Sequence, residues 1–201
     1  MPRSFFARSS LDVAPDLLGR DVRAVSEAGV VRARLVEVEA YLGSDDPGSH
    51  AFRGQTPRNT VMFGPPGHLY VYFTYGMHWC ANVVCGREGV AEAVLLRAAV
   101  ILDGRDVALT RRPKSTARDL ARGPARLAKA LDLDGSDNGA DIVCGGLQFL
   151  AGQPVSAAEI RTGPRVGVAG AGAPTPWRYW VDGVAEVSAY RAAVVRAPRK
   201  A

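Results

Sequence analysis

Alternating and helically spaced apolar positions predict the first elements of the chain. The apolar residues of segment 11–18 have helical spacing, which predicts a short helix opened by Ser9 or Ser10. Segments 21–26 and 30–41 alternate apolar and polar residues, as strands do, and a short glycine-containing turn separates them. The chain therefore begins with a helix followed by a β-hairpin.

A second hairpin dominates the middle of the sequence. Residues 69–74 alternate with a period of two, Tyr75 and the glycine after it break the alternation, and residues 79–84 form a return strand. Tyr72 then lies on a strand face, while Tyr75 lies near the exposed tip beside Met77. Turn tips usually hold Asn, Asp or Gly. Either Tyr75 folds back onto the core, or the tip has a function.

An apolar strand and a long loop flank this hairpin. Residues 43–66 are rich in Gly, Pro, Ser, Asp and Asn, which predicts a loop of a length that is often functional. Residues 92–98 read as an apolar strand that carries Arg97 on the same face as Ala93 and Leu95. An arginine on such a face must find acceptors or a ligand.

The second half of the chain mixes helices, loops and short strands. Two helices are predicted, one capped by Ser115 or Thr116 and one opened by Gly123 and Pro124. The remaining predicted segments are a polar surface excursion at 134–146, strands at 164–168 and 177–181, and a loosely held basic end at 194–201. The fold class predicted is α/β (mixed), a single domain over residues 1–201 with a largely antiparallel, hairpin-rich sheet flanked by helices.

Composition limits the class of protein. A chain of 201 residues with 47% hydrophobic content can bury one sizeable core. No apolar run approaches the length of a membrane span, and the N-terminus is too short and too charged for a signal peptide. The three cysteines include no CxxC pair and no histidine partner at zinc spacing, so we expect reduced thiols in an intracellular protein.

Positive charge gathers in one segment. The whole chain carries a net charge of +5 and has a pI near 9.4. Residues 104–129 hold eight basic and two acidic side chains, a net charge of +6, so the remainder is close to neutral. Such a run is either a solvated helix face or a surface that meets phosphates, and the near-neutral remainder favours the second interpretation.

Two carboxylates mark a candidate site on the strand at 30–41. Strict alternation puts Glu37, Glu39 and Tyr41 on one face together with Leu35, opposite an apolar face. That face is either exposed to solvent, the commoner case, or part of a site. His50 lies in the loop that follows, where a lone histidine is more often structural than catalytic. No residue pattern suggests a metal or a cofactor.

Several blocks in order resemble one known family. They are Glu37–Gly43, His50, Gln55–Asn59, Leu69–Tyr72, Tyr75–Met77, Cys80–Asn82, Leu95–Arg97, Gly123–Pro124 and Pro164–Gly167. Together they are similar to the alkyladenine (3-methyladenine) DNA glycosylase family, and the similarity extends from the first helix to Trp180. The stretch 169–176 is smaller and less charged than usual for that family, and the excursion at 137–146 also departs from it.

This resemblance implies an enzyme of base-excision repair. It would flip alkylated or deaminated purines out of duplex DNA and hydrolyse the bond between base and deoxyribose. Glu39 is implied as the general base that activates water, and Arg97 as its support. Tyr41, His50 and Tyr72 would enclose the flipped base, and Asn82 would exclude the guanine amino group. Tyr75 and Met77 would enter the gap in the DNA stack.

The expected partner is double-stranded DNA that contains damaged purines. The pocket motifs contain no lysine, so a Schiff-base step is not expected and the enzyme would be monofunctional. We expect a monomer without a membrane partner, in the cytoplasm, associated with the nucleoid in a bacterium or nuclear in a eukaryote. Three alternatives remain open: a non-catalytic sensor of damaged bases, a hydrolase of free nucleosides, and an enzyme acting on RNA.

Overall fold

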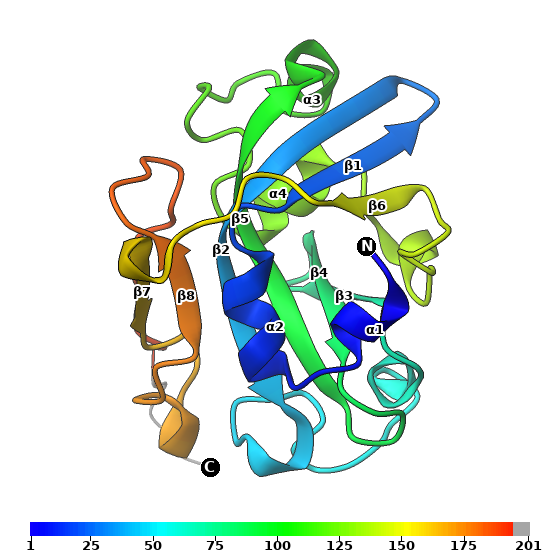
Figure 1. Ribbon diagram of the computed structural model, residues 1–201, viewed down its shortest axis with the longest axis vertical. Coiled ribbons are helices and arrows are strands. Elements are labelled where there is room, and N and C mark those ends of the chain that lie inside the picture. The colour runs from blue at the N-terminus through cyan, green and yellow to red at the C-terminus, as the bar shows by residue number, and fades with distance from the viewer. Residues whose placement is uncertain (195–201) are drawn as a thin grey trace, which may run out of the picture.

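Eight strands form one sheet around the long strand β2 (Gly29–Leu42) in the computed structural model, which describes residues 1–194 (Figure 1). The other strands are β1 (Asp21–Ser26), β3 (Leu69–Thr74), β4 (His78–Cys85), β5 (Glu92–Asp103), β6 (Leu147–Leu150), β7 (Ile160–Gly163) and β8 (Arg178–Val181). The main order is β3-β4-β5-β2-β1-β6, and every pairing between these strands is antiparallel. The predicted fold class is therefore confirmed. Apart from Val194, the prediction for residues 194–201 lies outside the described residues.

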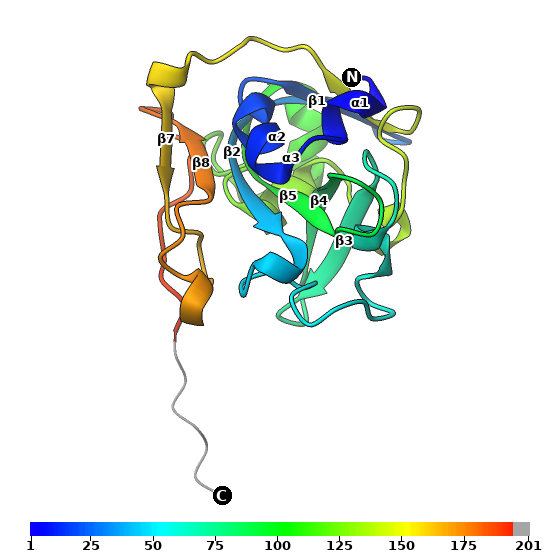
Figure 2. The same cartoon turned by 60° about the horizontal axis from the view of Figure 1, so that its bottom comes forward.

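Strand β2 is central because it pairs along both edges. One edge pairs with β5 over most of its length, while the other pairs first with β1 and then, at residues 37–39, with β8. β8 also pairs with β7, and an extended connection crosses the molecule from β6 to reach this pair (Figure 2). Neither β6 nor β7 was predicted, and each has four residues.

Within residues 1–194, four short helices pack against the sheet. They are α1 (Arg3–Phe6), α2 (Ser10–Leu17), α3 (Arg105–Arg111) and α4 (Pro124–Ala130). The side chain of Ser9 accepts a hydrogen bond from Leu11 N–H at the start of α2, as predicted for an N-cap. α2 packs on β2 and β5, while α4 packs on β4 and β5. The short 3₁₀ turns are η1 (Gly43–Asp45), η2 (Thr60–Phe63), η3 (Gly135–Asp137), η4 (Ala157–Glu159) and η5 (Gly170–Gly172).

Two apolar clusters hold these elements together. The larger joins α1, α2 and α4 to the inner face of the sheet, and it includes Phe6, Leu17 and Leu127. Each such side chain stabilises the fold by about 1.5–3 kcal/mol when fully buried. The smaller cluster includes Met62 and Tyr70 and lies where the loop at 43–66 covers β3, β4 and β5. The loop is therefore fixed to the sheet by its own small core.

A β-bulge at Val36 changes which residues of β2 share a face, so the face predicted for Leu35 is wrong. Val36 has no partner in the register between β2 and β5, and the register shifts on both sides of Glu37. The core cluster contains Leu35 before the bulge, and Val38 after it. One extra residue changes the phase of the alternation. Leu35 thus faces the core and does not share the face of Glu37 and Glu39.

The first predicted helix of the basic segment was placed wrongly. The helix there is α3, which precedes Pro113, and the hydroxyl of Thr116 caps only a single turn by accepting Asp119 N–H at 3.3 Å. The chain then returns to the sheet, where Arg122 forms an isolated bridge with Ala98. This return to the sheet ends the turn before a helix can form.

The segment at 134–146 lies at the surface, as predicted, but it is held against the sheet and does not project from it. Leu69 N–H donates to Ala140 O at 2.9 Å, Val71 N–H donates to Asn138 Oδ1 at 3.0 Å, and Ile142 is buried. β3 is an edge strand, and an uncovered edge leaves main-chain groups unpaired. Residues 138–142 cover that edge.

The predicted strand at 164–168 does not form. β7 ends at Gly163, one residue before Pro164, which has no N–H to donate to a neighbouring strand. The last predicted strand does form, as β8. Over the described residues, the protein has no helix long and apolar enough to cross a membrane.

Candidate active site

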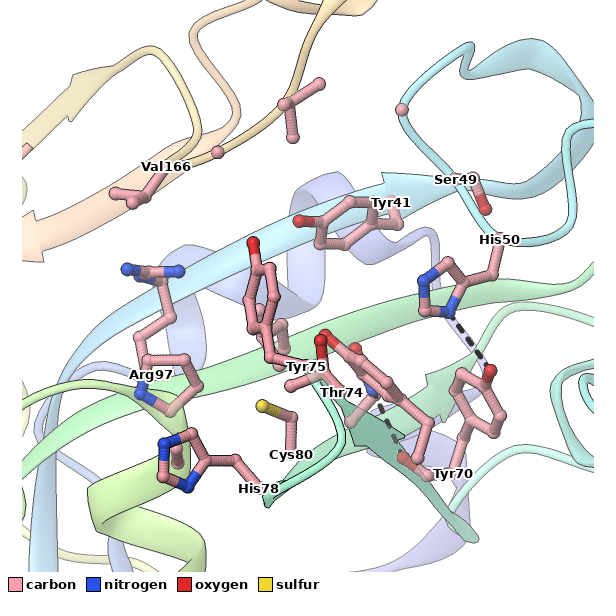
Figure 3. A pocket seen from close by; sticks show the side chains of 18 of the residues that line it. Tyr41, Ser49, His50, Tyr70, Thr74, Tyr75, His78, Cys80, Arg97 and Val166 are labelled. Atoms are coloured by element: carbon pink, nitrogen blue, oxygen red, sulfur yellow. Dashed lines mark hydrogen bonds between the residues drawn. The ribbon is translucent and has the colours of Figure 1, made fainter. Parts of the chain in front are cut away.

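A cavity of about 580 Å³ opens between the hairpin β3–β4, strand β5, and the loops at 47–50 and 166–169 (Figure 3). This volume lies in the usual range for small-molecule sites. Its lining includes Tyr41, His50, Tyr70, Tyr72, Tyr75, Cys80, Asn82, Arg97 and Val166. Figure 3 shows Arg97 and Val166 at one end and Ser49, His50 and Tyr70 at the other, with Tyr41 between them.

Three aromatic side chains form the wall at the His50 end. Tyr70 and Tyr72 stack with their ring centroids 5.6 Å apart, and the His50 ring meets Tyr72 edge-on at 4.6 Å. His50 Nδ1 also lies 3.0 Å from the Tyr70 hydroxyl. Tyr70 was not among the predicted site residues, although the period of β3 places it on the same face as Tyr72. The sequence signal for it was therefore present.

Burial changes the titration of this wall. Burial, together with the positive charge of Arg58, lowers the pKa of His50, so the imidazole is neutral at pH 7. Burial and the neighbouring Cys80 raise the pKa of Tyr72. Burial also raises the pKa of the Cys80 thiol to about 11, so the thiol carries its proton at pH 7. The wall is therefore uncharged.

Glu39 lies directly behind the cavity and is fully buried. Its Oε1 accepts Val166 N–H at 2.7 Å and lies 3.2 Å from Arg97 Nη1, while its Oε2 accepts the Tyr41 hydroxyl at 2.9 Å. The interpretation of this strand face as solvent-exposed is therefore wrong. Three lining residues of the cavity hold one carboxylate. Burial and the Glu39 charge raise the pKa of Tyr41, which keeps the hydroxyl protonated as a donor.

Glu37, two residues earlier, lies in a second ionic cluster, which shares Arg97 with Glu39. Its Oε1 accepts both Arg97 Nε and Arg178 Nε at 2.7 Å, and its Oε2 accepts Ser188 N–H at 2.7 Å. Burial alone would raise the pKa of Glu37, but the charges of Arg97 and Arg178 outweigh burial and hold it below its ordinary value. Arg97 therefore joins the two carboxylates, since it contacts both.

A buried ion pair fixes the two loops of the cavity to each other. The Arg165 guanidinium donates to both carboxylate oxygens of Asp46, and both side chains are fully buried. Arg165 also lies over the Tyr41 ring, with its Cζ 4.5 Å from the ring centroid. A Cβ at Gly48 would lie 2.7 Å from Arg165 Nη2, so only glycine fits there. Asp46 was missed by the sequence analysis, which had no means of linking it to a residue 119 positions away.

Asn82 reaches the cavity from β4. Its Nδ2 donates to Tyr70 O at 3.1 Å, which fixes the amide, and the side chain is buried apart from the part that lines the cavity. The register pairs it with Tyr70 across the hairpin and places Cys80 on the same face, as predicted from the sequence.

The hairpin tip projects two large side chains into solvent. Tyr75 is 85% exposed and Met77 is 67% exposed, so Tyr75 does not fold back onto the core. Tyr75 has φ +52° and Gly76 has φ +69°, and Met77 N–H donates to Thr74 O across the turn. A positive φ is unfavourable for a residue as bulky as tyrosine. The turn keeps Tyr75 at the mouth of the cavity.

The side chains of the basic segment differ in exposure and in what they contact, and the exposed Arg118 and Arg126 lie 3.9 Å and 3.4 Å from the Asp119 carboxylate. Arg111 binds Ala130 O, Ser26 and Asp132, and Arg112 binds the main-chain oxygens of Asp119 and Leu120. These two arginines therefore hold the fold together. The exposed cations of the segment are Arg105, Lys114, Arg118, Arg126 and Lys129. Pro124 and Ala125, just before Arg126, line the cavity.

The structure thus gathers Glu39, Arg97, Tyr41, His50, Tyr72 and Asn82 around one cavity, with Tyr75 at its mouth and Met77 beside it on the tip. Within residues 1–194, no group of three or more His, Cys, Asp or Glu side chains could hold a metal ion.

Comparison with known proteins agrees over nearly the whole chain. Residues 4–185 match the family model described as methylpurine-DNA glycosylase (MPG). A protein of Streptomyces avermitilis is 54% identical, with 99% of this chain and 95% of that protein aligned. Relatives in Leifsonia xyli and Burkholderia lata are 53% and 48% identical, each over 94% of this chain and over 92% and 90% of their own length. All three bear the provisional name 3-methyladenine DNA glycosylase.

Proposed function

The chain belongs to the methylpurine-DNA glycosylase family, and we propose that its cavity receives a damaged purine nucleotide flipped out of duplex DNA. It is a DNA-3-methyladenine glycosylase, a hydrolase of N-glycosyl bonds that acts in the repair of alkylated DNA. The observation that carries the proposal is the buried Glu39 carboxylate, held by three residues that line an aromatic cavity.

Glu39 is the proposed general base. A carboxylate offers about four lone-pair sites. Val166 N–H uses one on Oε1, which also lies 3.2 Å from Arg97 Nη1, and the Tyr41 hydroxyl uses one on Oε2, which leaves at least one for a water molecule. Glu39 is fully buried, so the Tyr41 side chain has to shift when nucleotide and water enter. Departure of the purine leaves a positively charged sugar, which the carboxylate stabilises while it activates the water.

The aromatic wall is the proposed binding site of the base. Purines such as 3-methyladenine and 7-methylguanine are cationic, and the faces of Tyr41 and Tyr72 attract a cation without a base-specific hydrogen bond. An uncharged wall avoids the repulsion that a protonated His50 would cause. Neutral deaminated purines such as hypoxanthine depend more on the hydrogen-bonding capacity of His50.

The hairpin tip is the proposed wedge that replaces the flipped base. Unstacking a nucleotide costs a few kcal/mol, and an inserted side chain offsets part of that cost. Tyr75 and Met77 are the two most exposed large apolar side chains beside the cavity. Because the turn holds Tyr75 in an unfavourable backbone conformation, its position is set before DNA binds.

The remaining proposals concern the oligomeric state, the cellular location and the number of activities of the enzyme. We propose a monomer that meets one DNA site, and a location where chromosomal DNA is found: the cytoplasm, associated with the nucleoid in a bacterium, or the nucleus in a eukaryote. The enzyme is proposed to be monofunctional, because no lysine of residues 1–194 lines the cavity.

One experiment tests the activity and separates the alternatives. The protein is incubated with duplexes that carry 3-methyladenine, hypoxanthine or ethenoadenine, and the released base is measured. Release from duplex DNA supports the proposal. Binding without release would identify a damage sensor, equal activity on the free nucleoside would identify a nucleoside hydrolase, and equal activity on RNA would widen the substrate.

Asn82 is expected to exclude normal guanine. Its amide is fixed at the cavity wall by Tyr70 O, where it leaves no room for the exocyclic amino group that distinguishes guanine from hypoxanthine. We expect Asn82→Ala to raise excision of guanine by about tenfold, most readily from mismatches, in which flipping costs least. Excision of hypoxanthine should not rise in parallel.

Asn138→Ala is the matched control for this experiment. Asn138 also binds the main chain of β3, through Val71 N–H, but it does not line the cavity. If Asn82→Ala lowers excision of both bases together with thermal stability, as Asn138→Ala is expected to do, Asn82 is only structural.

The exposed cations of the basic segment are expected to contact DNA phosphates. Changing Lys114, Arg118 and Arg126 together to Gln should weaken binding to damaged and undamaged duplex alike. The slope of log affinity against log salt should become shallower by about one for each phosphate that the variant no longer neutralises. The measurement is duplex affinity over a range of salt concentrations.

Arg112→Gln serves as the comparison for the charge experiment. Its guanidinium binds Asp119 O and Leu120 O, so its loss should lower thermal stability and leave the salt slope near that of the wild type. An unchanged slope in the triple variant would show that the three exposed cations do not meet DNA.

A further inference from the structure

The chain continues past β8 as a strap, residues 187–191, that crosses behind the cavity. The strap is held by main-chain contacts: Arg122 Nε donates to Val187 O at 3.0 Å, Arg178 Nη2 donates to Ser188 O at 2.6 Å, and Gly167 N–H donates to Arg191 O at 3.0 Å. The match to the family ends at residue 185, so the strap lies beyond it.

Ser188 connects the strap to the two carboxylates. Its hydroxyl donates to Glu37 Oε1 at 2.8 Å and accepts from Arg97 Nη2 at 3.2 Å. A hydroxyl has one proton and two lone pairs, so both bonds form at once. Its main-chain N–H donates separately to Glu37 Oε2 at 2.7 Å.

The Ser188 hydroxyl completes the orientation of Arg97. Each guanidinium nitrogen of Arg97 has its own acceptor: Nε has Glu37, Nη2 has Ser188, and Nη1 faces Glu39 at 3.2 Å. A planar guanidinium held at two nitrogens has the third fixed in direction. Without the hydroxyl, only the Nε contact remains to aim Nη1 at Glu39.

We propose that Ser188 is a positioning residue for excision, which holds Arg97 Nη1 against the Glu39 carboxylate from the C-terminal strap. This inference rests on the roles proposed above for Glu39 and Arg97. Ser188 does not line the cavity, so it acts through Arg97 and not on the nucleotide.

The test compares rate and affinity in the full-length protein. Ser188→Ala keeps the main-chain N–H bond to Glu37 and removes only the hydroxyl. The readouts are the single-turnover rate of base release from duplex DNA treated with a methylating reagent, the affinity for that DNA, and the melting temperature. We expect the rate to fall by about tenfold or more, as misplaced catalytic groups cause, while the affinity stays within about twofold.

Two further variants separate positioning from folding. Ser188→Thr keeps a hydroxyl and should restore the rate to within about threefold of the wild type. Ala189→Ser makes the reverse exchange at the exposed neighbouring position and should change nothing. Ser188→Ala removes two hydrogen bonds, so its melting temperature should fall by no more than about 8 °C, the cost of two net hydrogen bonds in a chain of this length.

The outcomes are distinct. A wild-type rate in Ser188→Ala overturns the inference, and so does a loss explained entirely by weaker DNA binding or by a smaller folded fraction. Glu39→Gln is measured in the same assay. If Glu39→Gln is inactive while Ser188→Ala is fully active, only the inference fails. If Glu39→Gln is fully active, the proposed role of Glu39 as general base fails, and if the wild type releases no base, the proposed function itself fails.

Discussion

Glu39→Gln is expected to lower excision by about a hundredfold or more, the scale of losing a general base, while binding of lesion DNA is retained. Glutamine fits the site because its amide can donate to the Tyr41 hydroxyl oxygen, while its carbonyl oxygen accepts Val166 N–H as the carboxylate does. The amide cannot take a proton from water, and it carries no charge to stabilise the sugar cation. Single-turnover release of base, measured beside the affinity for a lesion duplex, tests this.

Glu37→Gln is the comparison for that result, because the two carboxylates lie on the same strand and share Arg97. Both variants are assayed at a temperature where each is folded. We expect Glu39→Gln to lower the excision rate more than Glu37→Gln does. We expect Glu37→Gln to lower the free energy of unfolding more than Glu39→Gln does. If Glu37→Gln abolishes excision in fully folded protein while Glu39→Gln does not, the catalytic assignment is wrong.

The second large effect is on folding. Glu37→Gln is expected to lower the free energy of unfolding by about 3–5 kcal/mol, the usual result of removing one member of a buried ion pair. Its carboxylate is fully buried and compensates two buried arginines, Arg97 and Arg178. Among residues 1–194, neither guanidinium has a second carboxylate as close as Glu37. Arg97 lies 3.2 Å from Glu39, and Arg178 also donates to Ser188 O, a main-chain oxygen. Chemical denaturation measures this, and Glu27→Gln in the exposed β1–β2 turn should change stability by less than about 0.5 kcal/mol.

The same carboxylate gives stability a defined dependence on pH. The arginine charges hold the pKa of Glu37 below its ordinary value of 4.5, so the unfolded chain binds more protons than the folded chain in that interval. The contribution of Glu37 is therefore complete above pH 4.5 and is lost as the pH falls through the folded-state pKa. Between neutral and strongly acidic pH, the wild type should lose more stability than Glu37→Gln. Parallel curves for the two proteins would contradict this assignment.

Local sequence patterns predicted several of the elements that line the cavity in the folded protein. The alternation in residues 69–74 and 79–84 predicted the β3–β4 hairpin and the shared face of Tyr72, Cys80 and Asn82. The serine before α2 predicted the start of that helix. These predictions succeed because a period of two, a cap or a turn residue depends on neighbours within a few positions. The ordered motif blocks also pointed to the family that the comparisons show.

Two departures from the local patterns, one in β2 and one in the basic segment, could not be predicted from neighbouring residues. The bulge at Val36 moved Leu35 to the core face, and nothing in the sequence of β2 marks the extra residue. A helix predicted after Ser115 gave way to a return to the sheet at Arg122, since pairing with Ala98 competes with local helix formation. In both places a partner strand decided the conformation.

By itself, the sequence predicted the antiparallel hairpins and the aromatic face, and its resemblance to a known family singled out Glu39 as the candidate base. Only the tertiary structure decided which groups hold that carboxylate and which arginines are exposed. Val166 is 127 positions from Glu39, and Ser188 is 151 positions from Glu37. Arg111 and Arg112 look like neighbouring surface cations in the sequence, yet both bind the fold. The reason is physical: periodicity reports which way a side chain faces, whereas a buried charge is satisfied by whichever distant group the fold brings within hydrogen-bond distance.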